Sequence, residues 1–417
     1  MEPAVKRGKR FAVVIGMVTA CLAFSLSSLF HTEILAQDAK SQAVIEKAFP
    51  SSSKCKRCHE RVFEEWETSP LSKSIHSPAF RASLDAYLNS SAGSKDKATC
   101  FRCHAPHVRE FPDQAQLFVD QAKSGDPTLD GVACAQCHLI KQVDRAKHPP
   151  EPKYELGSKT LYGPYKDFVQ NLAHQSMELG LFQKSDLCLN CHQSVPSAVN
   201  LGKANDLLGA YEQSQAVKSG KECQSCHMPE QVGESANGEK KRKVANHTFP
   251  GRIGKLRQEA AKLDVQTKID GEKTTVTVKV QSLVPHNLPT THPAWATVVL
   301  DLDIKGKNLK TVFADKRVYG RTYADAKGQK TIFDFEAAKV LEDTVLKPEE
   351  TRVETFTFPT PKDTKTFDVD VTLNYAPISG PAPFLQRVEA EASKGSQDPV
   401  FQAIDIVKRT ENIPVTK

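Results

Sequence analysis

Ten of the eleven cysteines lie between Cys55 and Cys226, and they occur in five copies of one short motif. Each copy is Cys-x-x-Cys followed directly by histidine. Two thiols on one turn can bond to the two vinyl groups of a porphyrin, and the adjacent histidine then lies under the iron. The five motifs therefore predict five covalently attached haems c. The cysteines are Cys55, Cys58, Cys100, Cys103, Cys134, Cys137, Cys188, Cys191, Cys223 and Cys226, and the proximal histidines are His59, His104, His138, His192 and His227.

Zinc binding and disulfide bonding are the other common uses of paired cysteines, and both fit this pattern poorly. A zinc site does not need histidine directly after every second cysteine. Any one cysteine here would begin the motif by chance with a probability of about 0.0008. Because the five motifs use every cysteine after Cys21, coincidence is excluded.

The second axial position of each iron decides what a haem does. An iron with two protein ligands transfers electrons, whereas an open iron can bind and convert small molecules. Only Met177 and Met228 are methionines that could be the second axial ligand of an iron. The side chains available for that position therefore predict mostly bis-histidine ligation. Beyond the leader, seven histidines lie outside the motifs: His76, His107, His148, His174, His247, His286 and His292.

The positions of these histidines rank them as distal ligands. His76 follows the first motif, His174 precedes the fourth, and His247 follows the fifth, so these are the first candidates. His107 lies too near His104 to bind the same iron but could reach another. His148 precedes two prolines and is a weaker candidate.

One further candidate lies in the cysteine-free part of the chain. Pro285 to His292 reads Pro-His-Asn-Leu-Pro-Thr-Thr-His and joins two predicted strands. Two prolines stiffen this loop. We predict that His286 binds a haem iron, with His292 as the alternative.

The chain that positions these residues begins with an export segment. Four basic residues precede an uncharged, mostly apolar run over residues 11–30, and Ile34-Leu35-Ala36 offers a cleavage site. The run is also long enough to be an uncleaved membrane anchor. Val18-Thr19-Ala20-Cys21 offers a third reading, a lipoprotein signal. All three place residues 37–417 outside the cytoplasm.

The net positive charge of the chain does not indicate nucleic-acid binding. The net charge is +6, and residues 1–36 contribute two of these charges. With ten ionised haem propionates the net charge becomes about −6, so the basic residues serve as counter-charges. Lys240 to Lys243 form the densest basic run, which is either a solvated loop or a docking site for an acidic partner.

From about Lys255 the sequence predicts an antiparallel β-sandwich. Apolar and polar residues alternate over 275–280, 300–304 and 367–375, and Phe356 and Phe358 suggest another strand. Asp270-Gly271 is a hairpin-turn signal. Our first expectation is an Ig-like domain.

The motifs and their surroundings resemble the cytochrome c554-like family of multihaem cytochromes, typified by the tetrahaem electron carrier of ammonia oxidisers. The resemblance covers about residues 50–252. It implies stacked haem pairs in a mostly helical domain and electron transfer in the periplasm. This chain has five motifs where that carrier has four. The residues that carry the resemblance are Cys55 to His59, Trp66, Ser74, His76, Gly163, Pro164, His174, Cys188, Cys226 to Pro229 and His247.

The loop with His286 resembles the G-H-x-x-P-T-G loop in the C-terminal domains of related multihaem cytochromes. Pro285 and Thr291 stand where that loop has glycines. No motif ends in lysine, which differs from the pentahaem nitrite reductases, where one haem has a lysine ligand.

These observations predict an α+β multidomain protein. Residues 1–36 are an export signal or N-terminal anchor, residues 45–252 a mostly helical and loop-rich multihaem cytochrome c domain wrapped around its haems, and residues 255–417 an Ig-like β-sandwich. The favoured function is electron transfer from a membrane quinol-side donor to a periplasmic or extracellular acceptor. The alternative is an enzyme with one open haem that acts on a small nitrogen or sulfur compound.

Overall fold

The computed structural model describes residues 39–126, 129–147, 150–168, 172–193, 207–251, 255–290, 295–362, 364–394 and 403–415. The predicted export segment, His148 and His292 lie outside these residues. The chain divides into two units, one up to Pro50 and one from Ser51 to Lys417. Of the first unit, residues 39–48 form a helix.

The motif-bearing part of the second unit consists mainly of short helices. A helical turn suits the motif because it places residues i, i+3 and i+4 on one face, so that both thiols and the histidine meet one porphyrin. The helices are α2 (Ser53–Lys56), α3 (Glu60–Glu67), α4 (Pro78–Leu88), α5 (Phe101–His104), η1 (Pro106–Arg109), η2 (Pro112–Gln114), α6 (Ala115–Ser124), α7 (Cys134–His138), η3 (Gly180–Gln183), α8 (Asp186–His192), α9 (Leu207–Glu212), α10 (Gln215–Lys218) and α11 (Cys223–His227).

Three pairs of short strands also lie in this part of the chain, two between the third and fourth motifs and one after the fifth, where the sequence predicted mostly helices and loops. Each strand has four or five residues, too few for its alternation to be recognised in the sequence. The pairs are antiparallel β1 (Ile140–Asp144) with β2 (Glu151–Tyr154), parallel β3 (Thr160–Gly163) with β4 (Gln175–Glu178), and antiparallel β5 (Glu230–Gly233) with β6 (Arg242–Ala245).

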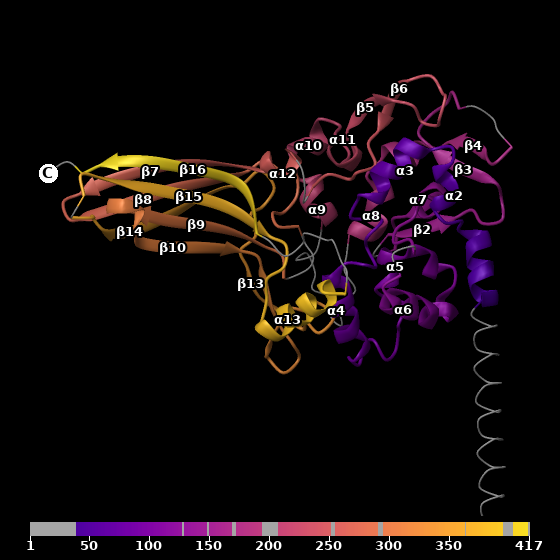
Figure 1. Cartoon of the computed structure of the whole chain (residues 1–417), viewed down its shortest axis with the longest axis horizontal. Coiled ribbons are helices and arrows are strands. Elements are labelled where there is room, and N and C mark those ends of the chain that lie inside the picture. Colours follow the sequence, from indigo (N-terminus) through magenta and orange to yellow (C-terminus); the bar gives the residue numbers. More distant parts are fainter. Residues whose placement is uncertain are drawn as a thin grey trace, which may run out of the picture. The chain divides into compact units, whose positions relative to one another are not determined.

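After α12 (Lys255–Gln258), two antiparallel sheets pack face to face, as the sequence predicted (Figure 1). The alternating residues Val276, Val278 and Val280 of one sheet and Leu300 and Leu302 of the other are fully buried in one shared core. One sheet has the order β14 (Thr351–Pro359), β8 (Lys273–Ser282), β7 (Ala261–Asp270). The other has the order β10 (Thr311–Tyr319), β9 (Thr297–Lys305), β15 (Thr366–Ala376), β16 (Ile404–Pro414), with η5 (Lys307–Leu309) between β9 and β10.

The predicted hairpin turn at Asp270-Gly271 joins β7 to β8. Asp270 pairs with Lys273, so the turn consists of Gly271 and Glu272. Gly271 has φ +59°, a left-handed conformation that glycine adopts without steric cost.

A smaller addition to the sandwich contacts the motif-bearing part. It comprises β11 (Arg321–Ala324), β12 (Lys330–Thr331), β13 (Lys339–Asp343) and α13 (Ala382–Ala392). Phe384 and Val388 of α13 share a buried apolar cluster with Ala79 and Ala82 of α4. Arg81 of α4 also forms a largely buried ion pair with Glu391 at 3.0 Å. No sequence pattern predicted this helix-to-helix contact.

Candidate haem-binding sites

Four of the five proximal histidines are oriented by the same kind of hydrogen bond. In each, ring nitrogen Nδ1 contacts a backbone carbonyl oxygen. The pairs are His59 with Ser235 at 2.6 Å, His104 with Ser74 at 3.0 Å, His138 with Tyr162 at 2.6 Å, and His227 with Pro250 at 2.6 Å. A carbonyl only accepts, so Nδ1 carries the hydrogen and Nε2 is left with a lone pair for a metal. This is the orientation that a haem iron requires of its proximal ligand.

Two of the predicted distal histidines lie opposite proximal ones. The ring centroids of His59 and His174 are 6.2 Å apart, and those of His227 and His286 are 6.4 Å apart. An imidazole nitrogen binds a metal at about 2 Å and lies about 1.2 Å from its ring centroid, so two rings on one iron have centroids about 6.3 Å apart. Both spacings fit two imidazoles that share one iron.

His247 lies near a third proximal histidine. Burial, and then the nearby charge of His138, lower the pKa of His247 to about 4. Its Nδ1 donates to the backbone oxygen of Ala245 at 3.1 Å, which leaves Nε2 as the nitrogen for a metal.

His286 has the same tautomer as His247, with the ring hydrogen on Nδ1. Burial is the main cause that lowers the pKa of His286 to about 4, and its Nδ1 donates to the Asn287 carbonyl at 3.0 Å. A neutral imidazole with an unprotonated nitrogen is the form that binds metals. The environment of His286 therefore favours ligation over protonation.

His76 and His107 are held differently. Nε2 of His76 donates to the backbone oxygen of Leu129 at 2.6 Å, so its bare nitrogen is Nδ1. His107 packs edge-on against Phe118, with ring centroids 4.6 Å apart, and the Gln136 amide hydrogen-bonds its Nδ1. Burial lowers the pKa of His107 to about 4.

The thiols show which motifs are neighbours. A hydrogen bond from Cys188 lowers the pKa of Cys223 to about 7, and a hydrogen bond from Cys55 lowers the pKa of Cys134. Sγ of Cys103 lies 3.8 Å from the backbone oxygen of Cys191. The first motif is thus beside the third, the second beside the fourth, and the fourth beside the fifth.

A further contact joins these pairs into one set. The charge of Cys137, in the third motif, contributes to the raised pKa values of both Cys188 and Cys191 in the fourth. With the contacts above, the five attachment turns therefore form one connected set.

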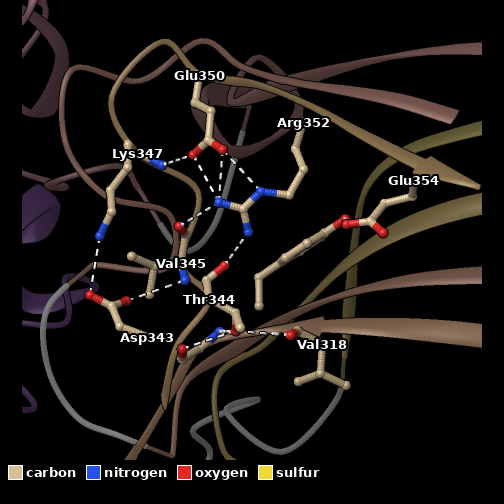
Figure 2. Close-up of polar contacts among 10 residues, drawn as sticks. Val318, Asp343, Thr344, Val345, Lys347, Glu350, Arg352 and Glu354 are labelled. Atoms are coloured by element: carbon tan, nitrogen blue, oxygen red, sulfur yellow. Dashed lines mark hydrogen bonds and ion pairs between the residues drawn. The ribbon is translucent and has the colours of Figure 1, made fainter. Parts of the chain in front are cut away.

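The loop that carries His286 is fastened to the segment between β13 and β14. Leu288 and Leu346 exchange two backbone hydrogen bonds, at 2.9 and 3.0 Å. Arg352 donates to the backbone oxygens of Thr344 and Val345 and pairs with Glu350, as Figure 2 shows. The Arg352 side chain thereby holds the chain on both sides of Leu346.

The side chains fit haem c. All ten motif cysteines are free thiols. Among the described residues, no cluster of three or more His, Cys, Asp or Glu side chains could hold a metal ion. A porphyrin supplies four nitrogen ligands itself, so paired imidazoles are the complement that its iron needs.

Comparisons with known proteins agree with this site. Residues 54–139 match the family described as cytochrome c554 and c-prime. A crystal structure of a penta-heme cytochrome c552 from Thermochromatium tepidum is similar over 88% of this chain and 100% of that chain, with a TM-score of 0.63 and 20% sequence identity. The resemblance of residues 54–139 to cytochrome c554-like proteins is thus confirmed, and the chain shares the fold of a penta-heme cytochrome together with a C-terminal β-region.

Two other solved structures cover a smaller share of the chain at low similarity. The C-terminal domain of wzt covers 38% of this chain and 74% of its own, with 13% identity and a TM-score of 0.21. A glycosyl hydrolase family 2 member from Bacteroides cellulosilyticus covers 36% of this chain and 13% of its own, with 13% identity and a TM-score of 0.18. No curated protein sequence matches the chain.

Within the described ranges, no helix combines the length and apolar character needed to cross a membrane. The predicted anchor over residues 11–30 lies outside those ranges.

Sequence reasoning missed the residues that orient the ligands. The carbonyl partners of the four proximal histidines lie between 23 and 176 positions away in the chain. Because a backbone oxygen is present in every residue, no local sequence signal distinguishes these acceptors.

Proposed function

We propose that this protein is an exported electron carrier that holds five haems c and ligates most of their irons with two histidines. The observation that carries the proposal is the pairing of His59 with His174 and of His227 with His286 at the spacing of two imidazoles on one iron. An iron with both axial positions filled has no place for a substrate and is suited to electron transfer. Each bound haem would accept and release one electron.

Two distal ligands follow from the same contacts: His174 would serve the iron of His59, and His286 that of His227. His247, whose Nδ1 donates to the Ala245 carbonyl and whose Nε2 therefore carries no hydrogen, is the candidate for the iron of His138. His76, through Nδ1, and His107 are the candidates for the irons of His104 and His192. In these roles the carbonyl acceptors of His59, His104, His138, His227, His247 and His286 would keep these imidazoles in one tautomer and one orientation.

The neighbouring thiols imply a route for electrons. The third motif adjoins the first and the fourth, and the fourth also adjoins the second and the fifth. An electron that enters at the first motif would therefore reach the fourth through the third, and could leave toward either the second or the fifth. A single connected set with more than one end suits a protein that links separate redox partners.

The cellular setting follows from the sequence. Haem attachment and the predicted export segment place the protein in the periplasm or on the outside of the membrane, with residues 45–252 as the multihaem domain and residues 255–417 as the β-domain. Its partners would be a membrane quinol-side donor and a periplasmic or extracellular acceptor.

Mass spectrometry and electron paramagnetic resonance of the purified oxidised protein test this proposal. Five haem additions and only low-spin signals are expected. Fewer than five additions in fully matured protein would contradict the haem count. A high-spin signal from one whole haem would contradict the carrier and favour the alternative, an oxidoreductase acting on a small nitrogen or sulfur compound.

A further inference from the structure

Cys58 differs from the other motif cysteines in its surroundings. It is the one exposed residue among the ten, whereas the other nine are half-buried. The second thioether of the first motif therefore forms at the surface of the protein. A partner's redox group can approach a haem most closely where the edge of that haem reaches the surface.

The connection between β5 and β6 lies against this turn. Asn237 donates its backbone N–H to the Cys58 oxygen at 2.7 Å and its side-chain amide to the Arg57 oxygen at 3.3 Å. The Ser235 carbonyl also accepts from His59. A segment almost 180 positions further along the chain thus becomes part of the surface at the first motif.

This packing concentrates positive charge. Residues 54–61 and 232–241, which we call the Cys58 face, contain six basic and three acidic residues, so two haem propionates would still leave the face positive. Arg57, Lys240 and Lys241 are exposed. No ion pair with another described residue neutralises these three side chains.

The Cys58 face also has an apolar element and a hollow. Val232 is 77% exposed, which is unusual for a valine in a strand. With His59, Arg61 and Lys241 it lines a cavity of about 300 Å³. Val62 and Ala236 also line this cavity, so charged side chains surround a partly apolar centre, which is the common anatomy of a protein-docking surface.

We propose that the Cys58 face docks an acidic redox protein and that electrons are exchanged there. This inference rests on the proposed electron-carrier function and adds to it the site and charge of one partner. Opposite charges accelerate encounter over a distance, and dissolved salt screens them. Exchange with an acidic partner should therefore be fast and should slow as ionic strength rises.

The experiment compares two reductants in stopped-flow measurements on the full holoprotein. A reduced, acidic plant-type ferredoxin is the charged probe, and reduced lumiflavin is the neutral one. The variant K240E/K241E reverses the two unpaired lysines. The matched control K262E/K268E makes the same change of net charge on exposed positions of β7.

We expect K240E/K241E to lower the second-order rate constant with ferredoxin about tenfold at low ionic strength and to flatten its salt dependence. The control should stay within about twofold of the parent protein, and lumiflavin should reduce all variants alike. The neutral variant K240Q/K241Q should give an intermediate rate constant. Equal effects of K240E/K241E and the control, or a parent rate that does not change with salt, would overturn the docking site.

Failure of the carrier proposal would be distinguishable from failure of the docking site. If the protein is not a carrier, neither reductant should reduce its haems rapidly in any variant. If only the docking site is wrong, lumiflavin and ferredoxin should both reduce the parent protein, and the two charge-reversal variants should behave alike.

Discussion

At the scale of single residues, the tautomer of each histidine decides which of its ring nitrogens can bind iron. A ring that donates Nδ1–H to a carbonyl has a fixed orientation and presents Nε2 with its lone pair. His59, His138 and His227 show this arrangement with contacts of 2.6 Å. His286, a predicted distal ligand, shows the same arrangement, and burial lowers its pKa and so opposes its protonation.

Replacing His286 with alanine should convert one low-spin haem to high spin. The change removes the imidazole whose ring lies 6.4 Å from that of His227 and leaves that iron with a single protein ligand. Electron paramagnetic resonance of the oxidised variant measures the result.

His292→Ala is the matched control, because His292 was the alternative ligand predicted from the same loop. It should leave the spectrum unchanged. A high-spin signal in His292→Ala together with an unchanged spectrum in His286→Ala would reverse the assignment.

At the scale of elements, the β-region holds firmly the loop that carries the predicted ligand His286. The loop with His286 follows β8, and Leu288 within it pairs with Leu346. Ser282, at the end of β8, donates its backbone N–H to the backbone oxygen of Glu350 at 2.8 Å. Figure 2 shows how the Glu350 carboxylate in turn holds Arg352 and the backbone N–H of Lys347.

Replacing Arg352 with methionine should loosen this loop. The guanidinium loses its bonds to the Thr344 and Val345 oxygens and to Glu350, which should lower the free energy of unfolding by about 1–3 kcal/mol. Urea denaturation followed by far-ultraviolet circular dichroism measures this loss.

The same variant should also show a fraction of one haem in the high-spin state, because a mobile loop holds His286 less completely. Arg409→Met on β16 is the control. The exposed side chain of Arg409 hydrogen-bonds, within the described structure, only to the backbone oxygen of the adjacent Lys408. Equal destabilisation in both variants, or no high-spin fraction in Arg352→Met, would contradict the role of Arg352.

At the scale of the whole molecule, the two parts obtain their stability from different sources. Among the described residues, the main core of the sandwich consists of twenty buried residues, all between Ala260 and Ile406 and so all within the β-region. The motif-bearing part instead arranges its thiols and histidines where haems attach. Its folding should depend on those cofactors, as small metal domains depend on their metal.

Full-length chain produced without haem attachment should therefore be folded only in its β-region. Limited proteolysis should digest residues 51–251 and leave a resistant fragment that begins near Lys255, while the holoprotein should resist cleavage in both parts. The fragment masses measure the result. Equal protection of the motif-bearing part without haem would show that its polypeptide supplies a sufficient core.

The sequence by itself determined the features that depend on a few neighbouring residues. Covalent attachment requires five consecutive positions, so Cys55 to His59 and its four repeats are recognisable without a structure. The strand with Val276, Val278 and Val280 is recognisable for a similar reason, because side chains alternate between the faces of a sheet. The turn at Asp270-Gly271 is also local, because its backbone geometry depends on one glycine.

Only the tertiary structure decided which distant residues meet. The sequence ranked His286 above His292 but could not place its ring opposite His227, because 59 positions separate the two residues. The contact between α4 and α13 and the packing of Asn237 on Cys58 have no local signal either. Such contacts depend on how the whole chain closes around its haems and its β-core, and that closure is a property of all the packed elements together.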